Sequence, residues 1–170
     1  MKSRWAQGLE PRFFTWVIRD RLAVSERPGG YSRNHRKVRR EEEILWLRQQ
    51  GFATVVSLLD SPHNLHAYEA AGLPFRHVPL GRPSGYSQRL PEVYAAITES
   101  IAGPDVKVLL HHEDFGDTLA GVIAGYLIYL GFAPDGPQAI TVVERLTGRQ
   151  LGPEGRTLVA VTLDEGLRAS

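Results

Sequence analysis

The sequence contains no cysteine in its 170 residues, which excludes disulfide bonds and metal sites built from thiolates. It also lacks a long apolar run, because the uncharged stretch 118–130 is shorter than the roughly 20 residues of a membrane-spanning helix. The first fifteen residues carry four charges and no apolar segment of the kind found in signal peptides. We therefore expect a cytoplasmic protein with no membrane partner.

Hydrophobic residues make up 42% of the chain, enough for one full core, and we expect a single domain over 1–170 with residues 1–11 poorly ordered. The Pro, Gly and Ser-rich stretch 81–89 is predicted to be a loop over the strand ends. Short apolar runs alternate with segments in which apolar residues recur at helical spacing. They predict strands at 13–18, 21–24, 53–59, 75–80 and 106–110, and helices at 38–50, 62–71, 90–102, 118–130, 137–146 and 153–167. This alternation indicates an α/β fold, with a small, mainly parallel sheet flanked by helices.

The net charge of +1 is unevenly distributed along the chain. Residues 1–40 hold eleven Lys and Arg against three acidic residues, and the densest part is Arg33 to Arg40, RNHRKVRR. One interpretation is a basic surface that faces phosphate, nucleic acid or another polyanion. The other is a solvated loop and first helical turn, neutralised by the glutamates at 41–43. No aromatic residues are interleaved with the charges, which disfavours single-stranded nucleic acid.

The stretch from Lys107 to Leu130 organises the rest of the chain. Its first residues form a short run rich in β-branched and apolar types, typical of a buried strand. From Thr118 onward, apolar residues recur every three or four positions, which is typical of a buried helix. Between them lies a compact loop, HHEDFGDT. Strand, tight loop and helix in this order aim backbone N–H groups and the positive end of a helix at one point, as anion sites do.

This stretch resembles the signature of the cysteine-dependent tyrosine and dual-specificity phosphatases. In that family a hydrophobic strand leads to His-Cys, five residues, Arg, Ser or Thr, and a helix that reads like AxYLI. His111 matches the leading His, and AGYLI at 124–128 matches the helix. The segments RFFTWVIRDRLAVS, EEILWLRQQGF, VVSLLD and YEAAGLPFRHVPL resemble small bacterial members. The resemblance covers roughly residues 12–151 and implies the three-layer phosphatase fold. Residues 111–118 are called the signature loop below.

Four positions that carry chemistry in the family hold other residues here. His112 stands at the nucleophilic Cys, Thr118 at the phosphate-holding Arg and Leu119 at the hydroxyl that follows. The general-acid Asp has its nearest counterpart in Arg82. Because the chain has no cysteine, no shift of register restores a thiolate. The resemblance therefore implies a degenerate, catalytically inactive bacterial protein, a pseudophosphatase, that uses no cofactor.

The candidate binding site is the signature loop, composed of His111, His112, Glu113, Asp114, Phe115, Gly116, Asp117 and Thr118. In one interpretation the loop fills its own anion site, with Asp117 or Thr118 capping the helix and Asp114 occupying the loop centre. In another, the loop still binds phosphate or a different ligand without turnover.

Two further hypotheses make the protein an enzyme or a polyanion binder. A phosphoesterase would use His112 as nucleophile, or a metal held by His112, Asp114 and Asp117, although we expect no metal. For a binding role we expect a phosphorylated protein or other anionic partner at Arg33–Arg40, in preference to nucleic acid.

Overall fold

The computed structural model describes residues 8–170 and is built around one five-stranded sheet, in the order β1-β2-β5-β3-β4. Strands β1 and β2 are antiparallel, and all other neighbours are parallel. The strands are β1 (Thr15–Ile18), β2 (Leu22–Ser25), β3 (Phe52–Ser57), β4 (Phe75–His77) and β5 (Lys107–His111). The mainly parallel sheet that the sequence predicts is confirmed.

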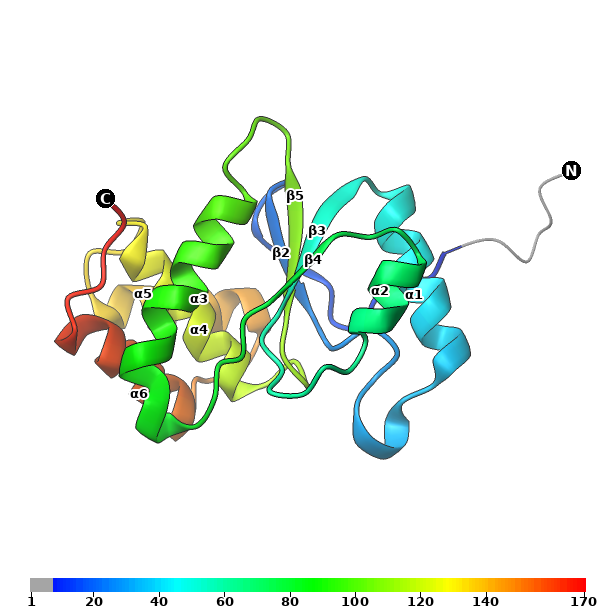
Figure 1. Ribbon diagram of the computed structural model, residues 1–170. Helices are drawn as coiled ribbons and strands as arrows, with labels where there is room; N and C mark the ends of the chain where they lie inside the picture. Colours follow the sequence, from blue (N-terminus) through cyan, green and yellow to red (C-terminus); the bar gives the residue numbers. More distant parts are fainter. Residues whose placement is uncertain (1–7) are drawn as a thin grey trace, which may run out of the picture.

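Helices cover both faces of the sheet, so the molecule has three layers (Figure 1). On one face, Leu109 of β5 packs in a cluster with Ile44 and Leu47. On the other face, Val108 and Leu110 belong to the larger core cluster. The first face carries α1 (Lys37–Gln49) and α2 (Leu65–Ala70), and the second carries α3 (Tyr86–Ser100), α4 (Asp117–Tyr129), α5 (Gly136–Thr147) and α6 (Pro153–Asp164). The expected α/β architecture, a sheet flanked by helices, is thereby confirmed.

Helix α4 is buried along most of its length, and two glycines allow its neighbours to approach closely. A Cβ atom at Gly121 would lie 2.5 Å from the Gly155 Cα atom of α6. A Cβ atom at Gly125 would collide with the hydroxyl of Tyr94, which is bonded to Thr162 of α6 at 2.7 Å. The glycines therefore serve packing between helices, which is possible only without a side chain.

The predicted loop 81–89 is shorter in the structure, because α3 begins at Tyr86 and a 3-10 turn occupies Pro83–Gly85. Tyr86 and Leu90 are buried, and their burial extends the helix upstream of the predicted start. Pro91 consequently lies inside the helix, in its second turn. The prediction of a long lid over the strand ends was therefore wrong from residue 86 onward.

Residues 1–7, part of the stretch 1–11 expected to be poorly ordered, lie outside the described residues. Gly8 to Pro11 run beside α1, where the Leu9 N–H donates to the Glu42 carbonyl oxygen at 3.0 Å. No helix formed by residues 8–170 has the length and apolar character to cross a bilayer.

Candidate functional site

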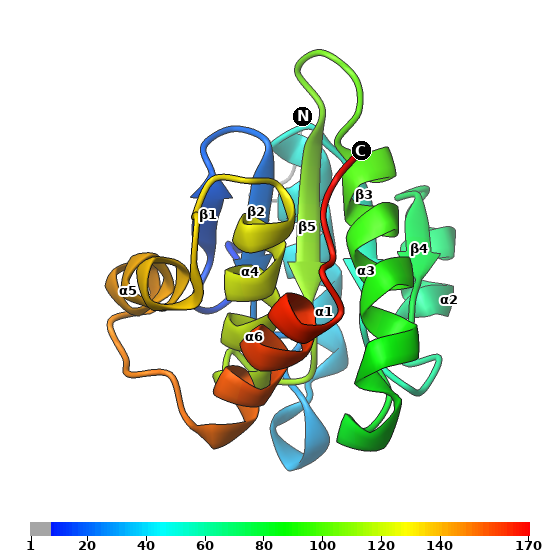
Figure 2. The ribbon, with the colours of Figure 1, turned by 90° about the vertical axis from the view of Figure 1, so that its left-hand side faces the viewer.

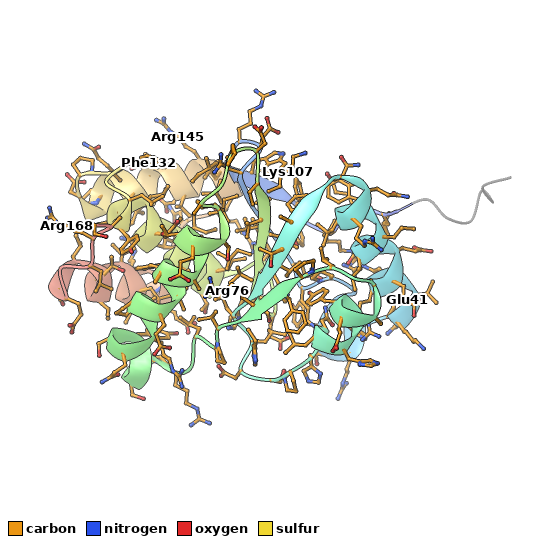
Figure 3. The ribbon with its side chains drawn as sticks, turned by 45° about the horizontal axis from the view of Figure 1, so that its top comes forward. Glu41, Arg76, Lys107, Phe132, Arg145 and Arg168 are labelled. Atoms are coloured by element: carbon orange, nitrogen blue, oxygen red, sulfur yellow. The ribbon has the colours of Figure 1, made fainter. Side chains whose placement is uncertain are left out.

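The signature loop lies where the carboxyl ends of the parallel strands meet, the edge at which α/β proteins usually bind ligands. β5 ends at His111 and α4 begins at Asp117, so residues 112–116 form the connection. Figure 2 shows β5 pointing toward this edge. At the opposite edge, labelled in Figure 3, Lys107 begins β5 and donates from Nζ to the Gln50 carbonyl oxygen at 3.0 Å.

His111 is fully buried and forms part of a hydrogen-bonded network beneath the loop. Its Nδ1 lies 2.9 Å from the His112 carbonyl oxygen, which can only accept, so Nδ1 carries the proton. Nε2 must then accept from the Tyr68 hydroxyl, 2.8 Å away. The Tyr68 oxygen accepts in turn from Asn64 Nδ2 at 3.2 Å. Desolvation lowers the pKa of His111 to about 4, which keeps the imidazole neutral.

His112, which the sequence resemblance matches to the nucleophile, is half-buried. Burial lowers the pKa of its imidazole, and the carboxylates of Glu113, Asp114, Asp60 and Glu154 oppose that shift. Glu154 also accepts a hydrogen bond from the Tyr86 hydroxyl at 2.8 Å. A neutral, acid-flanked imidazole therefore stands where the family's thiolate would be.

The backbone of the loop keeps a run of free donors. Among the described residues, none accepts a hydrogen bond from the N–H groups of residues 113–119. We call these N–H groups the anion cradle. Because unpaired backbone donors are costly away from water, the cradle favours a bound anion or solvent.

The structure contradicts the helix-capping part of the self-filled interpretation, while the Asp114 carboxylate lies against the loop, with its Oδ2 2.5 Å from the position of a Cβ atom at Gly116. Asp114 is exposed, and within residues 8–170 its side chain has no hydrogen bond. Gly116 is the N-cap of α4, without a side-chain capping bond, so neither Asp117 nor Thr118 caps that helix. Asp117 instead accepts from the N–H groups of Gly152 at 2.6 Å and Gly155 at 2.9 Å. Asp117 therefore caps the start of α6, because α6 approaches α4 closely at this point.

The side chains at the other altered positions lie in different settings. Thr118 lies in the first turn of α4, and Leu119 is buried in the core. Arg82 is exposed and precedes the 3-10 turn. Phe115 is buried, its ring stacks on Phe13 with centroids 5.6 Å apart, and its carbonyl accepts from Arg149.

Arg27, at the end of β2, is a site residue that sequence reasoning missed. Its side chain is 7% exposed, and its Nη1 lies 3.5 Å from Glu113 Oε2. Its Nε donates to Asn64 Oδ1 at 3.1 Å. Its backbone N–H donates to the Glu113 carbonyl oxygen at 3.1 Å. No local sequence pattern points to Arg27, because it reaches the loop through the pairing of β2 with β5, which brings the residues after both strands to one edge.

The basic segment Arg33–Arg40 forms the approach to α1 and its first turn, and folding uses part of its charge. Arg39 is paired with Glu43 at 2.8 Å and with Glu26 at 3.3 Å. The exposed basic residues of the segment are Arg33, Arg36 and Lys37.

The candidate metal ligands are not brought together. Among residues 8–170, no cluster of three or more His, Asp or Glu side chains has the arrangement of a metal site. Asp117 accepts hydrogen bonds at the start of α6, and Asp114 is exposed and lies beside Gly116.

Comparison with known proteins gives matches only at the level of structure. No family model and no curated protein matches the sequence. A kinase associated phosphatase, with its catalytic cysteine substituted by serine, has a TM-score of 0.73 at 18% identity, covering 94% of this chain and 98% of that one. Tk-PTP in its active form has a TM-score of 0.68 at 21% identity, and the match covers 89% of this chain and 96% of Tk-PTP. The core catalytic domain of the PP-IP phosphatase SIW14 from S. cerevisiae, in complex with citrate, has a TM-score of 0.62 at 13% identity, covering 91% and 87%. The chain thus has the fold of the tyrosine and dual-specificity phosphatases.

Proposed function

We propose that this protein binds a phosphoryl group, or a similar oxyanion, in the signature loop without hydrolysing it. One observation carries the proposal: the cradle N–H groups donate to no acceptor within residues 8–170, while the positions matched to the family's catalytic residues hold His112, Thr118 and Arg82. Backbone donors are enough to hold an anion. Hydrolysis also needs a nucleophile, a guanidinium that stabilises the transition state and an acid for the leaving group.

An aryl phosphate incubated with the purified protein is expected to show no thiol-type turnover. Without a thiol nucleophile the covalent step of that chemistry cannot occur, and the absence of arginine at position 118 removes an oxyanion donor worth about 10²- to 10³-fold. Inorganic phosphate should nevertheless shift the amide signals of the signature loop in ¹H–¹⁵N spectra. Turnover that survives metal stripping, disappears in His112→Ala and persists in the exposed-histidine control His66→Ala would contradict the proposal.

A second candidate is hydrolysis through a phosphohistidine at His112. It is favoured by the lowered pKa of this imidazole, because only the neutral ring can attack phosphorus. It would be recognised in the same assay by acid-labile phosphate on the wild-type protein that is absent from His112→Ala.

For the partner, we propose a phosphorylated protein whose acidic surface meets the exposed side chains of Arg33, Arg36 and Lys37. This segment lies at the same end of the sheet as the signature loop (Figure 2). Arg33→Glu combined with Lys37→Glu should weaken binding of an acidic phosphopeptide about tenfold and flatten its salt dependence. Arg145→Glu combined with Arg168→Glu, at two exposed arginines outside this segment, is the charge-matched control (Figure 3). Equal weakening by both variants would exclude a localised surface.

A further inference from the structure

Arg27 is buried with fewer polar partners than its charge requires. A guanidinium has five N–H donors and is costly to remove from water unless a carboxylate or another anion compensates it. Within residues 8–170, Nε is the only side-chain nitrogen of Arg27 that donates a hydrogen bond, to Asn64. The nearest compensating charge is Glu113, 3.5 Å from Nη1 and itself 37% exposed.

A second, partly buried arginine has closer acidic partners than Arg27. Arg39 is 13% exposed and places Nε 2.8 Å from Glu43 and Nη2 3.3 Å from Glu26. Arg27 is buried more deeply, yet it has a single acid at longer range. The terminal nitrogens of Arg27 therefore retain donor capacity for an anion.

Arg27 is also held rigidly against the first residue of the cradle. Its backbone N–H is bonded to the Glu113 carbonyl, and its Nε is bonded to Asn64. Asn64 is fixed by donating to the Pro28 carbonyl at 2.8 Å and to Tyr68, the hydroxyl that supports His111. A preorganised guanidinium loses little entropy when it binds an oxyanion.

We infer that Arg27 supplies, from the end of β2, the guanidinium that the signature loop has lost at position 118. The ligand is a tetrahedral oxyanion, such as the phosphate of a monoester, held by the cradle and by the terminal nitrogens of Arg27. Glu113 competes with that anion for Arg27, and its exposed carboxylate swings outward when the anion binds. The inference rests on the proposed function, because it concerns the anion in the same loop.

The experiment is a titration with inorganic phosphate, followed through the loop amide signals in ¹H–¹⁵N spectra. Arg27→Gln should weaken phosphate binding about tenfold or more, because charge-assisted hydrogen bonds are lost. Glu113→Gln should tighten phosphate binding about fivefold, because a competing negative charge is removed. Arg149→Gln, at the other arginine that touches the loop, should bind like wild type. Arg27→Lys keeps the charge without the planar fork and should bind at least about threefold more weakly.

The outcomes separate this inference from the proposed function. If phosphate moves the loop amides with equal affinity in wild type, Arg27→Lys and Glu113→Gln, the assignment of Arg27 is wrong and the proposed function stands. Loss of binding in Arg149→Gln, but not in Arg27→Lys, also overturns it. If phosphate moves no loop amide even in Glu113→Gln, the proposed function fails together with the inference. Should Arg27→Gln not fold, Arg27→Lys and Glu113→Gln still decide the question.

Discussion

Asp117→Ala is expected to lower the free energy of unfolding by about 2–3 kcal/mol. Asp117 lies in the first turn of α4, but its carboxylate caps the start of α6. Its carboxylate accepts from Gly152 and Gly155, two N–H groups at the start of α6 that would lose their acceptor. Charge-assisted bonds are worth about 1.5–3 kcal/mol each, and the carboxylate's partial exposure reduces the sum. For a chain of this size the melting temperature should fall by roughly 5–10 °C.

The matched control is Asp114→Ala, in the same loop and with the same chemistry. Asp114 is exposed and, within residues 8–170, its side chain has no hydrogen bond, so its removal should change stability by less than about 0.5 kcal/mol. Chemical denaturation of the two variants under one set of conditions measures the difference. The reverse order, with Asp114→Ala the less stable protein, would restore the interpretation in which the loop fills its own anion site.

Acidification from pH 7 to pH 4 is expected to destabilise the fold by about 3 kcal/mol through His111 alone. The folded pKa of His111 is about 4, because burial penalises the imidazolium, while the unfolded chain titrates near 6.5. Between these values the unfolded state binds the proton and the folded state does not. The stability is therefore full above about pH 6.5 and is lost as the pH falls toward 4.

The hydrogen-bond network explains why the folded state resists this proton. Protonated Nε2 would have to donate to Tyr68, whose hydroxyl proton now points to that nitrogen. The neighbouring Asn64 amide already donates to the Tyr68 oxygen, and Asn64 Oδ1 already accepts from Arg27. The displaced hydroxyl proton thus has no acceptor in the network, and the positive charge of Arg27 adds repulsion.

The pH effect is isolated by comparing wild type with His111→Gln, in denaturation series at pH 7 and pH 4.5. The variant should be less stable at neutral pH but should lose less stability on acidification. His66→Gln, on the exposed side of α2, leaves the network intact and serves as the control. Parallel pH dependences in wild type and His111→Gln would show that another group governs acid stability.

The sequence by itself determined the strand, loop and helix around residues 107–130 and the alternation that specifies the sheet. These features follow from local periodicity, because a buried strand and a buried helix each need a characteristic spacing of apolar residues. It also predicts which catalytic residues are replaced, since the helix motif AGYLI sets the register in which His112 and Thr118 are compared with the family signature. The start of α3 was not predicted, because the burial of Tyr86 depends on distant contacts.

Only the tertiary structure decided which partners the charged side chains of the loop contact. Asp117 and Asp114 are equivalent in sequence terms, yet Asp117 accepts from Gly152 and Gly155, more than thirty positions away, while Asp114 is exposed and lies against Gly116 of its own loop. Arg27 reaches the loop because β2 lies beside β5, a pairing across more than eighty residues that no local pattern reports. Periodicity specifies which residues are buried, but the partner of a buried charge depends on which elements meet at the strand ends.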